Sequence, residues 1–182
     1  MKRLITRLAI TALFAALISA GAFITIPIGP VPIILQNMFT LLSGLVLGPA
    51  LGTSSVWLFI AAGAVGLPVF SSSGSPAGFA RIIGPTGGYI MGYVVGAFVA
   101  GFIAGVPRPG EKLPVWRLAL AAAMGILMVY VPGLYRLKMY LETTWPQTIA
   151  AGFVPFIAGD IIKGVIVCLI TPRLRRVASE LL

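Results

Sequence analysis

The chain has 182 residues, of which 59% are apolar and 9% are charged, and its mean hydropathy is +1.06. A soluble domain carries about 25% charged residues, whereas here no Asp, Glu, Lys or Arg occurs from Leu8 to Ala80. This excludes a water-soluble fold and predicts an all-α integral membrane protein with a single domain, residues 1–182. The net charge of +9 comes from basic residues at the ends of apolar segments, where they orient a membrane protein, so we do not expect nucleic-acid binding.

Proline, glycine and charged residues divide the chain into six candidate transmembrane helices. These are residues 8–26, 34–51, 53–67, 86–106, 115–134 and 148–171. The turn at 48–52 (GPALG) predicts that the second and third helices are antiparallel neighbours. The third is short for a span of about 17–25 residues, which leaves tilting, partial re-entry or misplaced bounds open.

The first candidate span begins like a secretory signal, because basic residues precede an apolar run that contains Ala20-Gly21-Ala22. The apolar run continues beyond that point, so we expect a retained first helix. Ala12, Ala16 and Ala20 are spaced one helical turn apart and form a flat stripe that lets another helix approach closely. Packing within the chain and docking of a separate membrane subunit are both open.

Two connections are more specific than plain loops. Residues 27–32 are rich in proline, which favours rigid extended backbone, and lead to the amides of Gln36 and Asn37. Residues 68–85 form a long connection of the kind used as a lid or binding loop. The sequence GPTGGY at 84–89 then opens the fourth helix, and its glycines suit close approach of a ligand, a turn or helix packing.

The last span carries Asp160 and Lys163 within an apolar stretch. A charge near the middle of a membrane helix costs about 2.5–3.5 kcal/mol on insertion scales. The i, i+3 spacing places both groups on one helix face, so we expect them to face the protein interior or a wet cavity. They form either a solute site or a buried ion pair that fixes helix register.

The basic residues predict the orientation. With a cytoplasmic N-terminus, nine lie on the inner side, three on the outer side and Lys163 within the membrane. The inner ones are Lys2, Arg3, Arg7, Arg108, Lys112, Arg117, Arg173, Arg175 and Arg176; the outer ones are Arg81, Arg136 and Lys138. This excess predicts that both termini are cytoplasmic, in agreement with an even number of spans.

Missing residues exclude several chemistries. Without histidine there is no Ser-His triad and no usual His-containing zinc site, and we expect no metal. Asp160 is the only aspartate, so one chain cannot form an aspartyl dyad, and there is no phosphate-binding P-loop. We therefore expect no enzyme. A solute-binding transporter component and a structural or assembly membrane protein both remain.

Four motifs together resemble a known family. They are PVPIILQ at 30–36, GAVGLPVF at 63–70, GPTGGY at 84–89 and PFIAGDIIK at 155–163. In this order they are similar to BioY, the biotin-specific substrate-binding (S) component of energy-coupling factor (ECF) transporters. The likeness covers residues 6–176.

The resemblance implies a six-helix protein of the bacterial inner membrane that captures biotin as cargo and uses no cofactor. It also implies partners, a transmembrane coupling protein and two cytoplasmic ATPases, and assigns docking to the Ala12, Ala16 and Ala20 stripe. Another vitamin such as riboflavin or thiamine, a purely structural role, and self-association remain alternatives.

The resemblance also implies roles for individual residues. Asp160 would accept a hydrogen bond from a ureido N–H of biotin, and Lys163 would donate to the ureido oxygen or to the carboxylate. Thr86, Gly87 and Tyr89 would close over the ligand, and Gln36 would add an amide. Arg81 would bind the carboxylate or be a solvated loop charge. Asn37 stands where many relatives have Thr, from which we infer no change in specificity.

Overall fold

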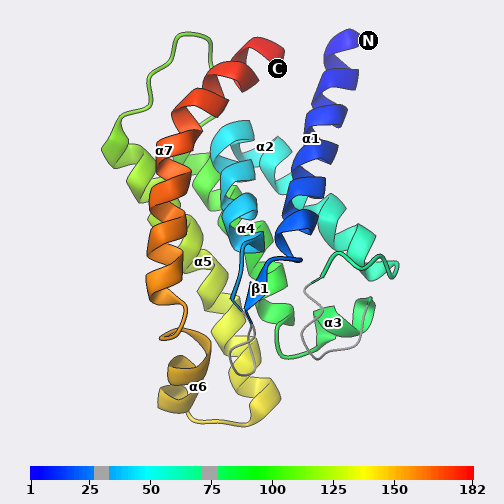
Figure 1. Ribbon diagram of the computed structural model, residues 1–182, viewed down its shortest axis with the longest axis vertical. Coiled ribbons are helices and arrows are strands. Elements are labelled where there is room, and N and C mark those ends of the chain that lie inside the picture. The colour runs from blue at the N-terminus through cyan, green and yellow to red at the C-terminus, as the bar shows by residue number, and fades with distance from the viewer. Residues whose placement is uncertain (27–32, 71–77) are drawn as a thin grey trace.

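The computed structural model describes residues 1–26, 33–70 and 78–182, which form a bundle of helices with both termini at one end (Figure 1). The helices are α1 Lys2–Gly21, α2 Gln36–Ala64, α3 Phe79–Ile83, α4 Gly87–Ala104, α5 Val115–Leu141, α6 Trp145–Gly152 and α7 Ile157–Leu181. Two short strands, β1 Thr25–Ile26 and β2 Ile33–Ile34, pair antiparallel. The predicted rigid connection at 27–32 and the segment 71–77 of the predicted long loop lie outside the described residues.

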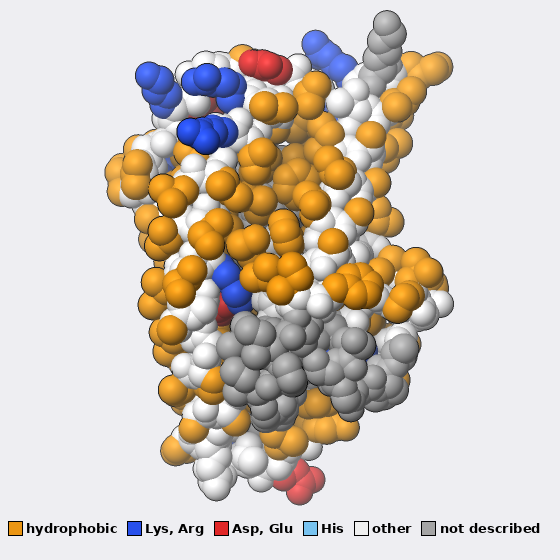
Figure 2. Space-filling view, viewed as in Figure 1, with side chains coloured by type: hydrophobic (Ala, Val, Ile, Leu, Met, Phe, Trp, Pro, Cys, Tyr) orange, Lys and Arg blue, Asp and Glu red, His pale blue; other side chains and the backbone are white. Residues whose placement is uncertain are grey.

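Length and apolar composition mark this chain as a multi-pass membrane protein. Within the described ranges, α1, α2, α4 and α5 are long and apolar enough to cross a membrane, and α6 with α7 make a fifth candidate if that bent pair is one span. Figure 2 shows hydrophobic side chains over the middle of the molecule and Lys and Arg side chains gathered near the end that holds the termini. This is the distribution expected for a protein surrounded by lipid.

Helix α2 reverses direction at Gly48. The φ angle of Gly48 is 80°, which residues with a side chain rarely adopt, and Pro49 follows directly. A Cβ on Gly52 would lie 2.6 Å from the Cα of Gly44, so the two arms of α2 pack backbone to backbone. The predicted second and third helices therefore correspond to these two arms, and the turn between them is sharper than the predicted 48–52 segment.

Helices α4 and α5 also pack at backbone distance. Cβ atoms on Gly88, Gly92 and Gly96 would lie 2.2, 2.5 and 2.7 Å from carbonyl oxygens of α5. The expected end of the fifth helix at residue 134 is wrong, because α5 continues through Pro132 to Leu141. Proline removes one backbone donor, which membrane helices tolerate when neighbouring groups compensate.

The expected single helix over 148–171 is wrong as well. Helices α6 and α7 meet at an angle of 50°, with residues 153–156 between them. Pro155 lies in this break and disfavours helical backbone at the residue before it. Asp160 consequently lies in the first turn of α7 and not near the middle of a continuous helix.

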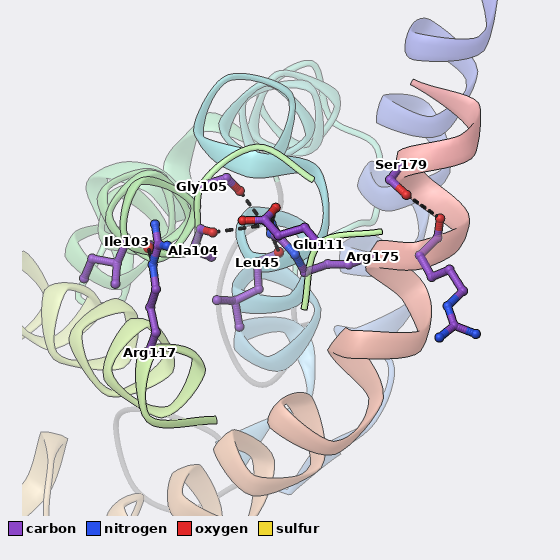
Figure 3. A network of polar contacts seen from close by, with 9 residues as sticks. Leu45, Ile103, Ala104, Gly105, Glu111, Arg117, Arg175 and Ser179 are labelled. Carbon is purple, nitrogen blue, oxygen red and sulfur yellow. Dashed lines mark hydrogen bonds and ion pairs between the residues drawn. The ribbon is translucent and has the colours of Figure 1, made fainter. Parts of the chain in front are cut away.

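A buried arginine binds backbone carbonyl groups at the end of the bundle that holds the termini (Figure 3). The guanidinium of Arg175, only 6% exposed, donates to Leu45 O at 2.7 Å, to Gly105 O at 3.0 Å and to Ala104 O at 3.4 Å. It also pairs with the Glu111 carboxylate at 3.4 Å. Because the last carbonyls of a helix lack partners within it, this cation stabilises the ends of α4 and of the first α2 arm.

Candidate ligand-binding site

A cavity lies inside the bundle and is lined by residues from α2, α3, α4, α5 and α7. Its polar lining residues are Gln36, Asn37, Thr40, Arg81, Thr86, Tyr89, Tyr93, Tyr130, Asp160 and Lys163, and its apolar lining residues are Ile34, Leu41, Phe70, Ile90, Gly96, Gly125, Ile126, Val129 and Phe156. Six of the seven predicted ligand-binding residues therefore border one space. The seventh, Gly87, is absent from the lining.

Asp160 and Lys163 form the buried ion pair that their spacing predicts. Lys163 Nζ lies 3.0 Å from Asp160 Oδ1, and the residues are 7% and 5% exposed. Asn37 bridges them, because its Nδ2 donates to Asp160 Oδ1 at 2.8 Å and its Oδ1 accepts from Lys163 Nζ at 3.1 Å. The hydroxyl of Tyr130 donates to Asp160 Oδ2. The pair thus faces the bundle interior and borders free space.

Three helices bring these four side chains together. Asn37 belongs to the first turn of α2, Tyr130 to α5, and Asp160 to the first turn of α7. A carboxylate is favoured near a helix N-terminus, where the macrodipole is positive. The break before α7 therefore supplies electrostatic support to Asp160 that a residue in mid-helix would lack.

Other polar groups in the cavity wall have no partner among the described residues. Arg81 is 4% exposed and its Nη1 has no hydrogen-bond acceptor, and the Oγ1 of Thr86 is likewise unpaired. Burial lowers the pKa of the Arg81 guanidinium from its ordinary value, and the nearby Tyr93 partly offsets this effect. The alternative of a solvated loop charge is therefore wrong. A buried donor without a partner is costly, and an anionic or carbonyl group of a ligand would satisfy it.

The remaining predicted residues make internal contacts. Gln36 Nε2 donates to Val69 O at 3.1 Å, and the Tyr89 hydroxyl donates to Gly152 O at 2.8 Å. A Cβ on Gly87 would lie 1.7 Å from Ile82 O, so that glycine lets α3 pack against the start of α4. These contacts hold the cavity wall in place.

The chemistry of the wall suits a partly apolar anion. Its lining includes two basic residues, Arg81 and Lys163, and one acidic residue, Asp160, so basic groups outnumber acidic ones. Aromatic side chains, including Phe70, Tyr93 and Phe156, supply the apolar surface. The free space is about 70 Å³, below the ~300–1,000 Å³ of ordinary small-molecule sites, so the walls must move apart around a ligand of that size.

Sequence reasoning did not assign Tyr130, Tyr93, Phe156 or Asn37 to the site. The tyrosines and the phenylalanine lie in apolar stretches, where they are indistinguishable from core residues. Asn37 did carry a signal, because an amide in an apolar stretch needs a partner.

The predicted docking stripe lies on the surface of this structure. Ala12, Ala16 and Ala20 are all exposed on α1, so packing within the described part of the chain does not cover them.

Comparisons with known proteins agree with this architecture. Residues 1–180 match the model of the BioY family. A probable biotin transporter BioY of Pyrococcus horikoshii is 39% identical over 91% of this chain and 94% of its own length. The biotin transporter BioY of Thermotoga maritima is 40% identical over 92% of this chain and 95% of its own length.

A solved structure also resembles this one closely. The crystal structure of the S-component for biotin from an ECF-type ABC transporter superposes with a TM-score of 0.82, at 32% identity, over 94% of this chain and 92% of that chain. On sequence and fold together, this chain belongs to the BioY family.

Proposed function

We propose that this protein captures biotin as the S component of an ECF-type transporter, with biotin as cargo and no cofactor. The observation that carries the proposal is the Asp160–Lys163 pair, held by Asn37 and Tyr130 in the wall of a buried cavity. Related proteins are named as biotin transporters, and the polar and apolar groups of the cavity wall match the chemistry of biotin. The family is one of transporter components, so the protein is not an enzyme.

Biotin suits the two kinds of polar group in this wall. Its ureido ring carries two N–H donors and a carbonyl acceptor, which match Asp160 and Lys163. Its carboxylate matches the unpaired donors of Arg81 and Thr86, and its thioether ring suits the aromatic surface. Charge-assisted hydrogen bonds in a buried site are stronger than neutral ones.

Binding to detergent-purified variants tests the site. We expect Asp160→Asn and Lys163→Met each to weaken biotin binding about 10- to 100-fold, because each removes a hydrogen bond between a charged group and the ligand, which contributes about 1.5–3 kcal/mol. Glu180→Gln and Lys112→Met, at exposed positions, are the matched controls. Isothermal titration gives the affinities, and thermal shifts with biotin, riboflavin and thiamine test the choice of vitamin. Unchanged affinity in both site variants would leave the pair as a purely structural feature.

We also propose six membrane crossings with both termini in the cytoplasm. The two arms of α2 each count as one crossing, and α6 with α7 form the last. The shared position of the termini supports an even number (Figure 1). The basic residues at that end support its cytoplasmic orientation.

The exposed alanine stripe of α1 is proposed as the contact for a transmembrane coupling protein, which would bring two cytoplasmic ATPases. Ala16→Trp should abolish co-purification with the coupling protein and leave biotin affinity unchanged, since a bulky side chain prevents close helix approach. Ala150→Trp, at an exposed alanine of α6, is the control. Normal co-purification of the Ala16→Trp protein would refute this contact.

A further inference from the structure

A long apolar groove runs between α5 and α7 and is separate from the ligand cavity. Its volume is about 730 Å³. On α5 and just before it the groove is lined by Leu113, Val115, Leu118, Ala119, Ala122, Ala123, Ile126, Leu127 and Tyr130; on α7 and just before it, by Phe153, Ile157, Asp160, Ile161, Gly164, Val165, Cys168, Leu169 and Pro172. Ala123 and Gly164 belong to the groove wall, and residues this small leave the space between the two helices unfilled.

The groove has the length of one lipid chain and starts at the end of the bundle that holds the termini. Leu113 and Pro172 lie at that end, and Tyr130 and Asp160 lie further along. Twelve residues separate Pro172 from Asp160, which is about 18 Å of helix. One leaflet of the hydrocarbon core is about 15 Å thick, so a chain that enters at Pro172 ends close to Asp160.

Cations surround the entrance of the groove. Lys112 directly precedes Leu113, Arg173 directly follows Pro172, and Arg176 lies four residues beyond Pro172 on the same helix face. All three side chains are exposed, and none makes an ion pair within the described ranges. Arg175 is instead turned inward to Glu111 (Figure 3). The three cations are therefore available to an anionic group outside the bundle.

We propose that this groove binds one anionic phospholipid, with an acyl chain between α5 and α7 and its phosphate beside Lys112, Arg173 and Arg176. An apolar channel that ends in unpaired cations matches a molecule with an apolar tail and an anionic head. It does not match a second copy of this chain, whose corresponding end is equally basic and would be repelled.

The proposed lipid chain would end against the ligand site, because Tyr130 and Asp160 border both the groove and the cavity. A chain there keeps water from the outer side of the Asp160 carboxylate. This inference goes beyond biotin capture and does not depend on it.

Lipid retention measured by native mass spectrometry tests the proposal. The protein in mild detergent is mixed with equal amounts of phosphatidylglycerol and phosphatidylcholine that have identical chains. We expect preferential retention of phosphatidylglycerol, which falls in Arg173→Gln/Arg176→Gln by roughly 5-fold for each arginine removed. Arg3→Gln/Arg7→Gln, two exposed arginines of α1 at the same end, should retain the preference. Ala123→Trp should lower retention of both lipids, and Ala16→Trp should not.

Several outcomes would overturn the lipid site. These are equal retention of both lipids by the unaltered protein, an equal loss in the α1 and α7 double variants, or no effect of Ala123→Trp. If Ala123→Trp instead prevents capture of the coupling protein or dissociates a dimer, the groove is a protein interface. Biotin affinity measured on the same samples reports folding, and absence of biotin binding by the unaltered protein would refute the proposed function while leaving the lipid result intact.

Discussion

At the level of single residues, the ion pair in the cavity depends on two neighbours. Asn37 contacts both charged groups, and Tyr130 donates to the second oxygen of Asp160. Their contacts leave Asp160 and Lys163 with limited freedom to rotate. A pre-oriented acceptor and donor lose less entropy when a ligand binds.

Removal of the Tyr130 hydroxyl tests this arrangement. We expect Tyr130→Phe to raise the Kd for biotin about 2- to 10-fold, because the Asp160 side chain is then ordered only when the ligand binds, at a cost of about 0.5–1.5 kcal/mol. The ring can keep its edge-to-face contact with Phe153, 4.7 Å between centroids. Tyr135→Phe, an exposed tyrosine of the same helix, is the control. Equal Kd values for the two variants, measured by titration calorimetry, would show that Tyr130 has no role in binding.

Sequence alone identified the charged residues of the site but not their neutral partners. A charge pair in an apolar stretch has a large solvation cost, so its burial beside other polar groups could be predicted. Tyr130 and Tyr93 carry no comparable signal, because tyrosine is common in apolar cores. Which side chains meet depends on three-dimensional packing of α2, α5 and α7, which local patterns do not specify.

At the level of helices, glycines determine how closely elements approach. Gly44 and Gly52 bring the arms of α2 together, and Gly88, Gly92 and Gly96 bring α4 against α5. The turn at 48–52 predicted that the arms are neighbours, but these backbone contacts were not predicted, since a glycine in a sequence suits a turn, a ligand contact or packing equally well. Several apolar membrane helices followed from composition, whereas the end of α5 and the break before α7 did not, because proline is compatible with both a kink and an end.

The hairpin in α2 predicts a sharp sensitivity at one position. Gly52→Ala should lower the unfolding free energy by about 1–3 kcal/mol, as overpacking does, because its Cβ would meet backbone atoms that cannot rotate away. Gly159→Ala is the matched control, since a Cβ there meets nothing within 4 Å. Melting temperatures in detergent compare the two. Equal melting of Gly52→Ala and the unaltered protein would contradict the close contact of the arms.

At the level of the whole molecule, the ligand cavity and the buried Arg175 cluster occupy different ends. The cavity is lined by residues of α3 and α5 and of the N-terminal parts of α2, α4 and α7, whereas Arg175 binds the ends of α4 and the first α2 arm. The cavity wall and the Arg175 cluster therefore share no residue. Family membership could be predicted from four motifs spread along the chain, because their order is more specific than any one of them.

Cysteine labelling tests the orientation of the bundle. In a Cys168→Ser background, Glu142→Cys should react with an impermeant maleimide in intact cells, because Glu142 follows α5 at the outer end of the proposed topology. Lys112→Cys should react only after permeabilisation. Both native side chains are exposed, so access to the solvent is comparable. The reverse pattern would invert the topology.

The position of the charge pair in the last helix also bears on biogenesis. Chains are synthesised from the N-terminus, so Asn37 and Tyr130 emerge from the ribosome before Asp160 and Lys163. Because α2 and α5 precede α7 along the chain, we expect both hydrogen-bonding partners to belong to inserted helices when α7 enters the bilayer. The charged side chains of Asp160 and Lys163 can then form hydrogen bonds with Asn37 and Tyr130 as soon as α7 is inserted. If α7 came first along the chain, these charges would remain in lipid until the helices that carry their partners were synthesised.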